Sequence, residues 1–153
     1  MKAVEKDAKE ILPMILKEFS YVKISEEKLR LKMQGRNYRV FKAVESKKII
    51  GFLELEKLNG ISARINGLSI NPEYRGKGFG KQLLEFAVEY LKKKNISQII
   101  LLVKQSNLEA KKLYEEAGFQ FMELLENKID NETIEELELN LHPEEEETPS
   151  YIG

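Results

Sequence analysis

The spacing of apolar residues predicts two helices at the start of the chain. From Ala3 to Phe19, apolar residues recur every three or four positions, as on one face of an amphipathic helix. Pro13 lies inside this stretch and removes one amide hydrogen bond, so we expect a kink there. Ser25 can cap a second helix that runs to about Met33. The aromatic link from Phe19 to Ile24 is expected to pack against the core.

Alternation with a period of two then predicts strands at Tyr38 to Val44, Ile49 to Leu55 and Ile61 to Ile70. The apolar positions of the third strand change parity between Ile65 and Leu68. One inserted residue, with Gly67 to absorb it, accounts for this change as a β-bulge. Because a bulge bends a strand away from its neighbour, we expect the main chain of Leu68, Ser69 and Ile70 to be open to an extended ligand.

The next part of the chain reads as a loop, a helix and a strand. Apolar residues at helical spacing from Leu83 to Leu91 predict a helix that ends near Asn95. Ile96 to Val103 is nearly continuous in apolar β-formers, as expected of a strand covered on both faces. With the strand before it, this order makes a βαβ unit. The loop after Ile70 then lies at the carboxyl end of a strand, where open α/β sheets bind ligands.

The last elements are a helix and a hairpin. Ser106 and Glu109 satisfy a capping box, and Gly118 suits the end of the same helix. Phe119 to Ile129 and Thr133 to Leu141 then read as a closing hairpin. The glutamate and leucine content of the final segment leaves a helix as an alternative.

Composition limits the classes of function. The 153 residues suffice for one domain, expected over residues 1–142, with an acidic, flexible tail over 143–153. A net charge of −1 and a pI near 6.0 argue against a nucleic-acid partner. The chain has no cysteine and one histidine, so a thiolate nucleophile is excluded and a Ser-His triad or metal centre is disfavoured. With no long apolar stretch or signal-like N-terminus, we expect a cytoplasmic protein without a membrane partner.

The loop from Arg75 to Lys81 is the strongest candidate for a ligand-binding site. Its three glycines let main-chain N–H groups approach a ligand without a Cβ in the way. The helix that begins here adds free amides and a partial positive charge. The loop also carries the cations Arg75, Lys77 and Lys81. We therefore predict a binding site for a ligand that carries phosphate.

Spacing narrows the choice of ligand. A dinucleotide fingerprint would need a glycine at Lys81, and a P-loop would need Ser or Thr at Gln82. R-x-x-G-x-G does fit, although an ordinary glycine-rich turn would explain the same residues. With this motif the chain resembles the GNAT superfamily of acetyl-CoA-dependent N-acetyltransferases, in which the motif holds the coenzyme A pyrophosphate. The resemblance implies cofactor-binding residues in two runs: Leu68, Ser69 and Ile70, and Arg75, Gly76, Lys77, Gly78, Phe79, Gly80 and Lys81.

A second motif supports the resemblance. N-x-x-A-x-x-L-Y-x-x-x-G-F, from Asn107 to Phe119, matches the second half of the GNAT signature, although helix architecture alone also explains these residues. In the family, the tyrosine protonates the leaving thiolate of coenzyme A and the asparagine helps to hold the pantetheine. The resemblance, which spans residues 3 to 141, thus implies Tyr114 as general acid and Asn107 as a cofactor contact.

The resemblance also implies a fold and a reaction. The fold is α+β in three layers, a mixed and mostly antiparallel sheet with helices on both faces. In this fold the fourth and fifth strands of the family form a parallel pair at the centre of the sheet, and the bulge separates them at one end. Family members usually begin with a short strand, for which only Met1 to Ala3 remain here. The reaction is direct acetyl transfer from acetyl-CoA to a primary amine, whether a small amine, a peptide α-amine or a lysine. No metal is implied, and a homodimer is compatible with the family.

The general base is where this sequence departs from the family. Many members place a glutamate on the fourth or fifth strand, where this chain has Asn66 and Leu102. Acetyltransferases of the ribosomal-alanine type often read LEVRxSN, and this chain reads LLVKQSN. Glu54 is a candidate base, although a surface position is favoured for Glu54 and Glu56; a water relay would also serve. A non-catalytic acetyl-CoA sensor on the same fold and an unrelated phosphate-binding domain remain as alternatives.

Overall fold

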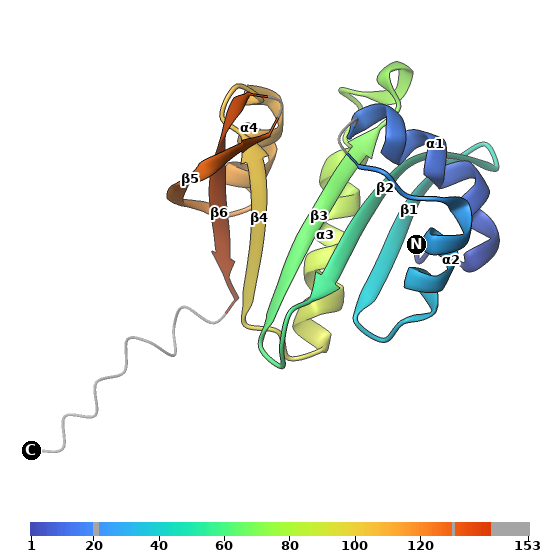
Figure 1. Cartoon of the computed structure of the whole chain (residues 1–153), viewed down its shortest axis with the longest axis horizontal. Coiled ribbons are helices and arrows are strands. Elements are labelled where there is room, and N and C mark those ends of the chain that lie inside the picture. The colour runs from blue at the N-terminus through green and yellow to red at the C-terminus, as the bar shows by residue number, and fades with distance from the viewer. Residues whose placement is uncertain (20–21, 130, 142–153) are drawn as a thin grey trace, which may run out of the picture.

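The computed structural model describes residues 1–19, 22–129 and 131–141, whose strands form one six-stranded sheet (Figure 1). The strand order is β1-β2-β3-β4-β6-β5, in which β3 and β4 run parallel and all other neighbours run antiparallel. The strands are β1 (Tyr38–Glu45), β2 (Lys48–Lys57), β3 (Ser62–Ile70), β4 (Gln98–Lys104), β5 (Gln120–Ile129) and β6 (Glu132–Asn140). The predicted acidic tail lies outside the described residues.

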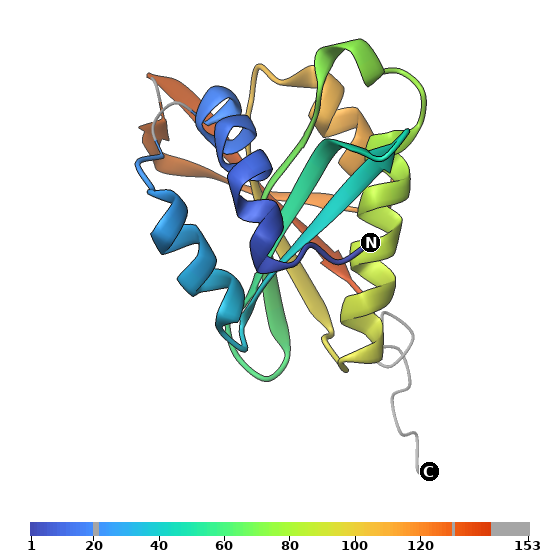
Figure 2. The same ribbon diagram turned by 90° about the vertical axis from the view of Figure 1, so that its right-hand side faces the viewer.

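Helices cover both faces of this sheet (Figure 2). They are α1 (Ala8–Glu18), α2 (Glu26–Gln34), α3 (Phe79–Lys93) and α4 (Leu108–Glu116), with short 3-10 turns η1 (Glu5–Asp7) and η2 (Pro72–Tyr74). α1 and α2 share one core with one face of the sheet, and α3 and α4 share another core with the opposite face. The predicted three-layer α+β fold is confirmed.

The two cores explain why β2 is buried along most of its length. Leu53 and Leu55 point into the core of α3, where the helix buries its predicted apolar stripe. Phe52 points the other way, into the core that contains Ile11 of α1 and Leu29 of α2. Alternate residues of one strand therefore fill two separate cores, as in a sheet covered on both faces.

β3 carries the predicted bulge. Its register with β2 shifts at Asn66, between the pair Leu55–Ile65 and the pair Glu54–Gly67. β3 pairs with β4 only along its first four residues, up to Ile65. Figure 1 shows the two strands together at one end and apart at their carboxyl ends. The bulge therefore leaves the last part of β3 with a neighbour on one side only.

The N-terminal segment is a partial strand followed by a shorter helix than predicted. Met1–Ala3 lies along the edge strand β1, where it makes a single bridge. The Ala3 amide donates to the Val40 carbonyl oxygen at 2.8 Å, and the Lys42 amide donates to that of Met1 at 2.7 Å. These bonds keep the first residues extended, so α1 begins only at Ala8.

Two predictions for the second half of the sheet have different outcomes. β4 is not covered on both faces as expected, because α1 and α2 pack over β1 to β3 and leave Leu102 41% exposed. The last segment is a strand and not a helix, since β6 pairs with β4 on one side and with β5 on the other. Cross-strand pairing thus overrides the helix-like composition of β6.

Gly67 sets how closely Phe19 packs on the bulge. A Cβ at Gly67 would lie 2.7 Å from Cε2 of Phe19, whose ring also meets that of Phe52 edge-on at 6.3 Å. We expect Gly67→Ala to lower the free energy of unfolding by about 1–3 kcal/mol, as overpacking does. Gly60→Ala is the control, because a Cβ there has nothing within 4 Å. It should change this free energy by less than about 0.5 kcal/mol. Equal effects in urea unfolding would contradict the prediction.

Candidate active site

The loop between β3 and α3 presents main-chain amides to a ligand. Gly76 and Gly78 adopt positive φ angles of 77° and 87°, and Gly78 is the N-cap of α3. No side chain caps this helix in the described part of the chain, and its first turn holds no acidic residue. The first N–H groups of a 15-residue helix are therefore available to an anion.

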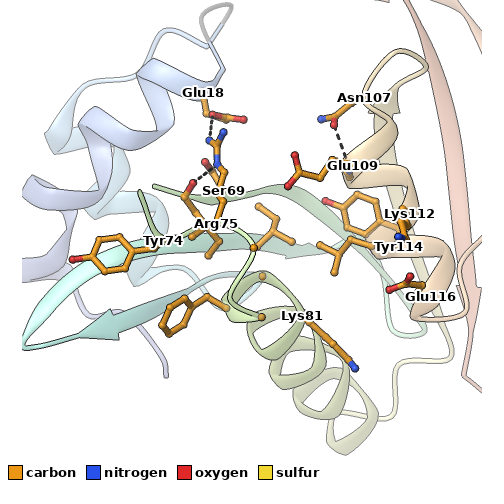
Figure 3. Close-up of a pocket in the computed structure, with 18 residues that line it drawn as sticks. Glu18, Ser69, Tyr74, Arg75, Lys81, Asn107, Glu109, Lys112, Tyr114 and Glu116 are labelled. Carbon is orange, nitrogen blue, oxygen red and sulfur yellow. Dashed lines mark hydrogen bonds and ion pairs between the residues drawn. The ribbon is translucent and has the colours of Figure 1, made fainter. Parts of the chain in front are cut away.

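A cavity of about 310 Å³ opens beside these amides (Figure 3). Its lining includes every predicted cofactor residue except Lys77: Leu68, Ser69, Ile70, Arg75, Gly76, Gly78, Phe79, Gly80, Lys81, Asn107 and Tyr114. Lys77 instead lies over the ring of Tyr74, 5.5 Å from its centroid. A Cβ at Gly76 or Gly78 would meet no protein atom within 4 Å, so both glycines border open space.

Arg75 connects this loop to the end of α1. Its Nε donates to the carbonyl oxygen of Ile70 at 2.7 Å, which holds the guanidinium beside the cavity. One of its terminal nitrogens lies 3.5 Å from the carboxylate of Glu18 (Figure 3). Glu18 could not be identified from the sequence, because it belongs to no motif and its contact with Arg75 spans 57 residues.

The start of α4 differs from the predicted capping box. Asn107, not Ser106, is the N-cap, and its Oδ1 accepts a hydrogen bond from the Ala110 amide at 3.1 Å. The Ser106 hydroxyl bonds to the carboxylate of Glu132 on β6 instead, which removes it from the cap. Asn107 is thereby fixed at the edge of the cavity, and its side-chain NH₂ group has no part in the cap.

Tyr114, on α4, lines the cavity. Its side chain is buried and packs edge-on against Phe119, with ring centroids 5.8 Å apart. Burial raises the pKa of Tyr114 to about 12. The hydroxyl is therefore protonated at neutral pH and can act as a hydrogen-bond donor to a developing negative charge.

A second cavity of about 320 Å³ lies between β3 and β4, where the strands have parted. It shares several lining residues with the first cavity: Glu18, Leu68, Asn107, Ala110 and Tyr114. The two cavities therefore meet at Tyr114 and at the bulged strand.

The second cavity holds few charged groups. Asn66 and Leu102, the positions where the family's glutamate was expected, both line it. Its charged lining residues among those described are Glu18, Arg64 and Lys104. Arg64 Nε donates to Asn66 Oδ1 at 2.7 Å, which orients the bulge side chain. One carboxylate and two cations thus line this cavity, and Lys104 Nζ lies 3.2 Å from the carboxylate of Glu132.

Glu54 lines neither cavity, and the surface position expected for it is wrong. Its side chain is buried on the face of α1 and α2, where its carboxylate accepts a hydrogen bond from the Tyr38 hydroxyl. Burial raises the pKa of Glu54, although this bond and the nearby charge of Lys32 act in the opposite direction. Glu56, by contrast, is half-buried and lies 3.9 Å from Arg64.

The described residues contain no group of three or more His, Cys, Asp and Glu side chains placed to hold a metal ion. None of their helices is long and apolar enough to cross a membrane.

Comparison with known sequences points to one family. The model of the acetyltransferase (GNAT) family matches residues 6–119. The [ribosomal protein bS18]-alanine N-acetyltransferase of Haemophilus influenzae is 36% identical over 94 residues, which are 61% of this chain and 63% of that protein. The spermidine N(1)-acetyltransferase of Vibrio cholerae is 41% identical over 76 residues, 48% of this chain and 43% of that protein. The chain thus spans less than two thirds of the length of either relative.

Solved structures show the same fold. The ribosomal-protein-alanine N-acetyltransferase of Brucella melitensis superposes with a TM-score of 0.81 at 16% identity, over 92% of this chain and 98% of that one. The yncA protein of Salmonella typhimurium, solved with its cofactor acetyl-CoA, gives a TM-score of 0.79 at 14% identity, over 92% of both chains. At such identities the likeness shows the fold alone.

Glu54→Gln tests the cost of the buried carboxyl group. Because burial raises the pKa of Glu54 above its ordinary value of 4.5, the folded protein keeps a proton that the unfolded chain releases at that pH. The wild-type free energy of unfolding therefore falls as pH rises from about 4.5 to the raised pKa. Gln keeps an oxygen for the Tyr38 hydroxyl and cannot ionise.

We therefore expect Glu54→Gln to be more stable than the wild type at neutral pH, and the difference to shrink near pH 4. Urea unfolding at the two pH values measures the effect. A difference that stays constant with pH would show that ionisation of Glu54 is not its cause.

Proposed function

Because the chain belongs to the GNAT family of acetyltransferases, we propose that it transfers the acetyl group of acetyl-CoA directly to a primary amine in a ternary complex. The observation that carries the proposal is the junction of two cavities at Tyr114. Acetyl-CoA would occupy the first cavity and the amine the second. The thioester and the nucleophile would then meet where β3 and β4 part, so no acyl-enzyme intermediate is needed.

The first cavity suits the charged and extended parts of acetyl-CoA. Its diphosphate would bind the uncapped amides of α3, close to Gly76 and Gly78, with Arg75 and Lys81 to balance its charge. The pantetheine arm carries amide groups that need hydrogen-bond partners. The main chain of Leu68 to Ile70, unpaired on the side of β4, would supply them in the manner of an added strand.

The chemistry then requires three proton movements and one charge to be stabilised. The ammonium must lose one proton before the nitrogen attacks and a second once the N–C bond has formed, and water in the second cavity would accept both. Main-chain amides near the bulge would stabilise the oxyanion as the thioester carbonyl is attacked. The Tyr114 hydroxyl would donate to the sulfur as the thiolate leaves, since burial keeps this hydroxyl protonated.

Among amines, a peptide α-amine fits the second cavity best. Arg64 and Lys104 both line it, with Lys104 paired to Glu132 at 3.2 Å and Arg64 at 3.9 Å from Glu56. Glu18 is the one lining carboxylate among the described residues, too few for an acceptor with several positive charges, such as a polyamine. An α-amine has a pKa of about 8, against about 10.4 for lysine, so it is more easily deprotonated where Asn66 and Leu102 replace a glutamate. The relatives named for ribosomal-protein alanine support this choice, and such an acceptor would place the reaction in the cytoplasm.

A non-catalytic acetyl-CoA sensor is the second candidate. The absence of a carboxylate at Asn66 and Leu102 favours it, whereas the second cavity and the placement of Tyr114 favour an enzyme. Both functions predict acetyl-CoA binding in calorimetry. Only the enzyme releases coenzyme A thiol when acetyl-CoA is supplied with a panel of α-amine peptides, lysine derivatives and polyamines.

Gly78→Ala and Gly118→Ala form a matched pair that tests the cofactor cradle. Both glycines have positive φ, 87° and 101°, so each substitution carries a backbone cost of about 1–2 kcal/mol. Only Gly78 lines the first cavity. A Cβ at Gly118 would also lie 3.2 Å from Leu139 Cδ1, so we expect Gly118→Ala to lose at least as much thermal stability as Gly78→Ala. Acetyl-CoA affinity should fall at least tenfold in Gly78→Ala alone. Equal acetyl-CoA affinities in titration calorimetry would refute the cradle.

Tyr114→Phe tests the proposed general acid. The substitution keeps the ring that packs on Phe119, so folding and acetyl-CoA affinity should change little. We expect kcat to fall by about 10²-fold, the lower end of the range for general acids. The reason is that a hydroxyl with a pKa of about 12 is a weaker acid than a thiol.

Tyr90→Phe on α3 is the control for this prediction, because Tyr90 lies outside both cavities. The measurement is single-turnover transfer to an acceptor that the enzyme accepts, where chemistry limits the rate. Unchanged transfer by Tyr114→Phe would leave Tyr114 with a packing role only.

A further inference from the structure

We propose that Glu18 binds the ammonium group of the acceptor, and that Arg75 holds Glu18 back until acetyl-CoA binds. This inference rests on the proposed function, because it assigns the acceptor to the second cavity. It adds a residue to the acceptor site and a physical link between the two substrates.

Glu18 lies where the two cavities meet. Glu18 is the last residue of α1 and lines both cavities, whereas Arg75 lines only the first. Figure 3 shows the Glu18 carboxylate directed at the Arg75 guanidinium, on the opposite side of the cavity from Asn107 and Tyr114. Among the described residues, Glu18 is therefore the one carboxylate that lines both cavities.

The second cavity has one negatively charged side chain among the described residues that line it. This side chain is the carboxylate of Glu18. Of the two cations among these lining residues, Arg64 and Lys104, the second is paired with Glu132 at 3.2 Å. An acceptor amine arrives protonated and needs a negative partner in a partly desolvated site. Glu18 is the one lining residue described that can supply this charge.

The ion pair between Glu18 and Arg75 is weak. The Glu18–Arg75 separation is 3.5 Å, and the two side chains are 38% and 42% exposed. An exposed pair of this kind is weak and easily exchanged. The Arg75 Nε is held more closely, at 2.7 Å from the Ile70 carbonyl oxygen, so the guanidinium can change its anion without leaving the loop.

A diphosphate is the stronger partner for this guanidinium. It brings more negative charge than a carboxylate and accepts bidentate hydrogen bonds from arginine. When acetyl-CoA binds the loop, Arg75 turns to its diphosphate, and the Glu18 carboxylate becomes available to the second cavity. Binding of the two substrates is then positively coupled, and by linkage each increases the affinity of the other by the same factor.

The test measures acceptor affinity with and without a cofactor that cannot react. The acceptor is a fluorescently labelled hexapeptide with an N-terminal alanine, the cofactor analogue is desulfo-CoA at saturation, and the readout is anisotropy. For the wild type we expect desulfo-CoA to lower the peptide Kd by about tenfold, within the usual range of such coupling. Glu18→Gln should bind the peptide weakly in both states, with the coupling lost.

Arg75→Gln gives the sharper result. Although Arg75 belongs to the cofactor loop, its loss should strengthen peptide binding to the cofactor-free protein, close to the wild-type Kd with desulfo-CoA. Lys112→Gln is the matched control, since it removes another cation that lines the first cavity, whereas the ion-pair partner of Glu18 is Arg75. Glu10→Gln controls for loss of a carboxylate from α1 outside both cavities. Neither control should change the coupling.

Two outcomes would overturn the inference. One is a cofactor-free peptide Kd that Arg75→Gln leaves unchanged or that Lys112→Gln improves equally. The other is wild-type coupling, or wild-type peptide affinity, in Glu18→Gln. Mass spectrometry of the same peptide with acetyl-CoA separates this inference from the proposed function. Acetylation without coupling refutes the inference alone, and coupling without acetylation refutes the enzyme while the link between the sites stands.

Discussion

One extra residue in β3 determines the arrangement of the whole site. At Asn66 the strand gains a residue relative to β2, and its pairing with β4 ends one position earlier, at Ile65. Two parallel strands that would otherwise share a continuous ladder then separate. Both cavities lie along this opening, because the first is lined by the released end of β3 and the second by β3 and β4 together. Gly67 completes the bulge, since its bare Cα lets the Phe19 ring close over it.

The two cavities are specified by different parts of the chain. The first depends on main-chain geometry, through the positive φ angles of Gly76 and Gly78 and the uncapped start of α3. The second depends on side chains from separate elements, among them Glu18 of α1, Arg64 of β3 and Lys104 of β4. A cradle made of backbone suits a cosubstrate that does not vary, whereas a cavity made of side chains can be adapted to one acceptor by substitution.

This difference explains what could be predicted from the sequence. Glycines at fixed spacing report a local backbone requirement, so the loop that exposes the first amides of α3 could be predicted. The parity change between Ile65 and Leu68 likewise reports a local insertion, so the bulge and the parting of the strands were predicted. Contacts between distant segments leave no such trace. The burial of Glu54 beneath α1 and α2 and the bond of Ser106 to Glu132 arise only when the chain has folded. The sequence offered no sign of either.

The electrostatics of the site are consistent with an acceptor that needs little help to lose its proton. Leu102 and Asn66 leave the second cavity without a carboxylate on either central strand, and Tyr114, protonated up to a pKa of about 12, cannot act as a base there. A lysine side chain, with a pKa of about 10.4, would enter almost wholly protonated at pH 7, whereas an α-amine with a pKa of about 8 is neutral about one time in ten. Glu18 changes this balance in a particular way. A carboxylate beside an ammonium stabilises the charged form, so Glu18 favours binding and opposes deprotonation. A weak, half-exposed partner such as Glu18 therefore suits the reaction better than a buried one, because it can attract the amine without holding it in the form that cannot attack.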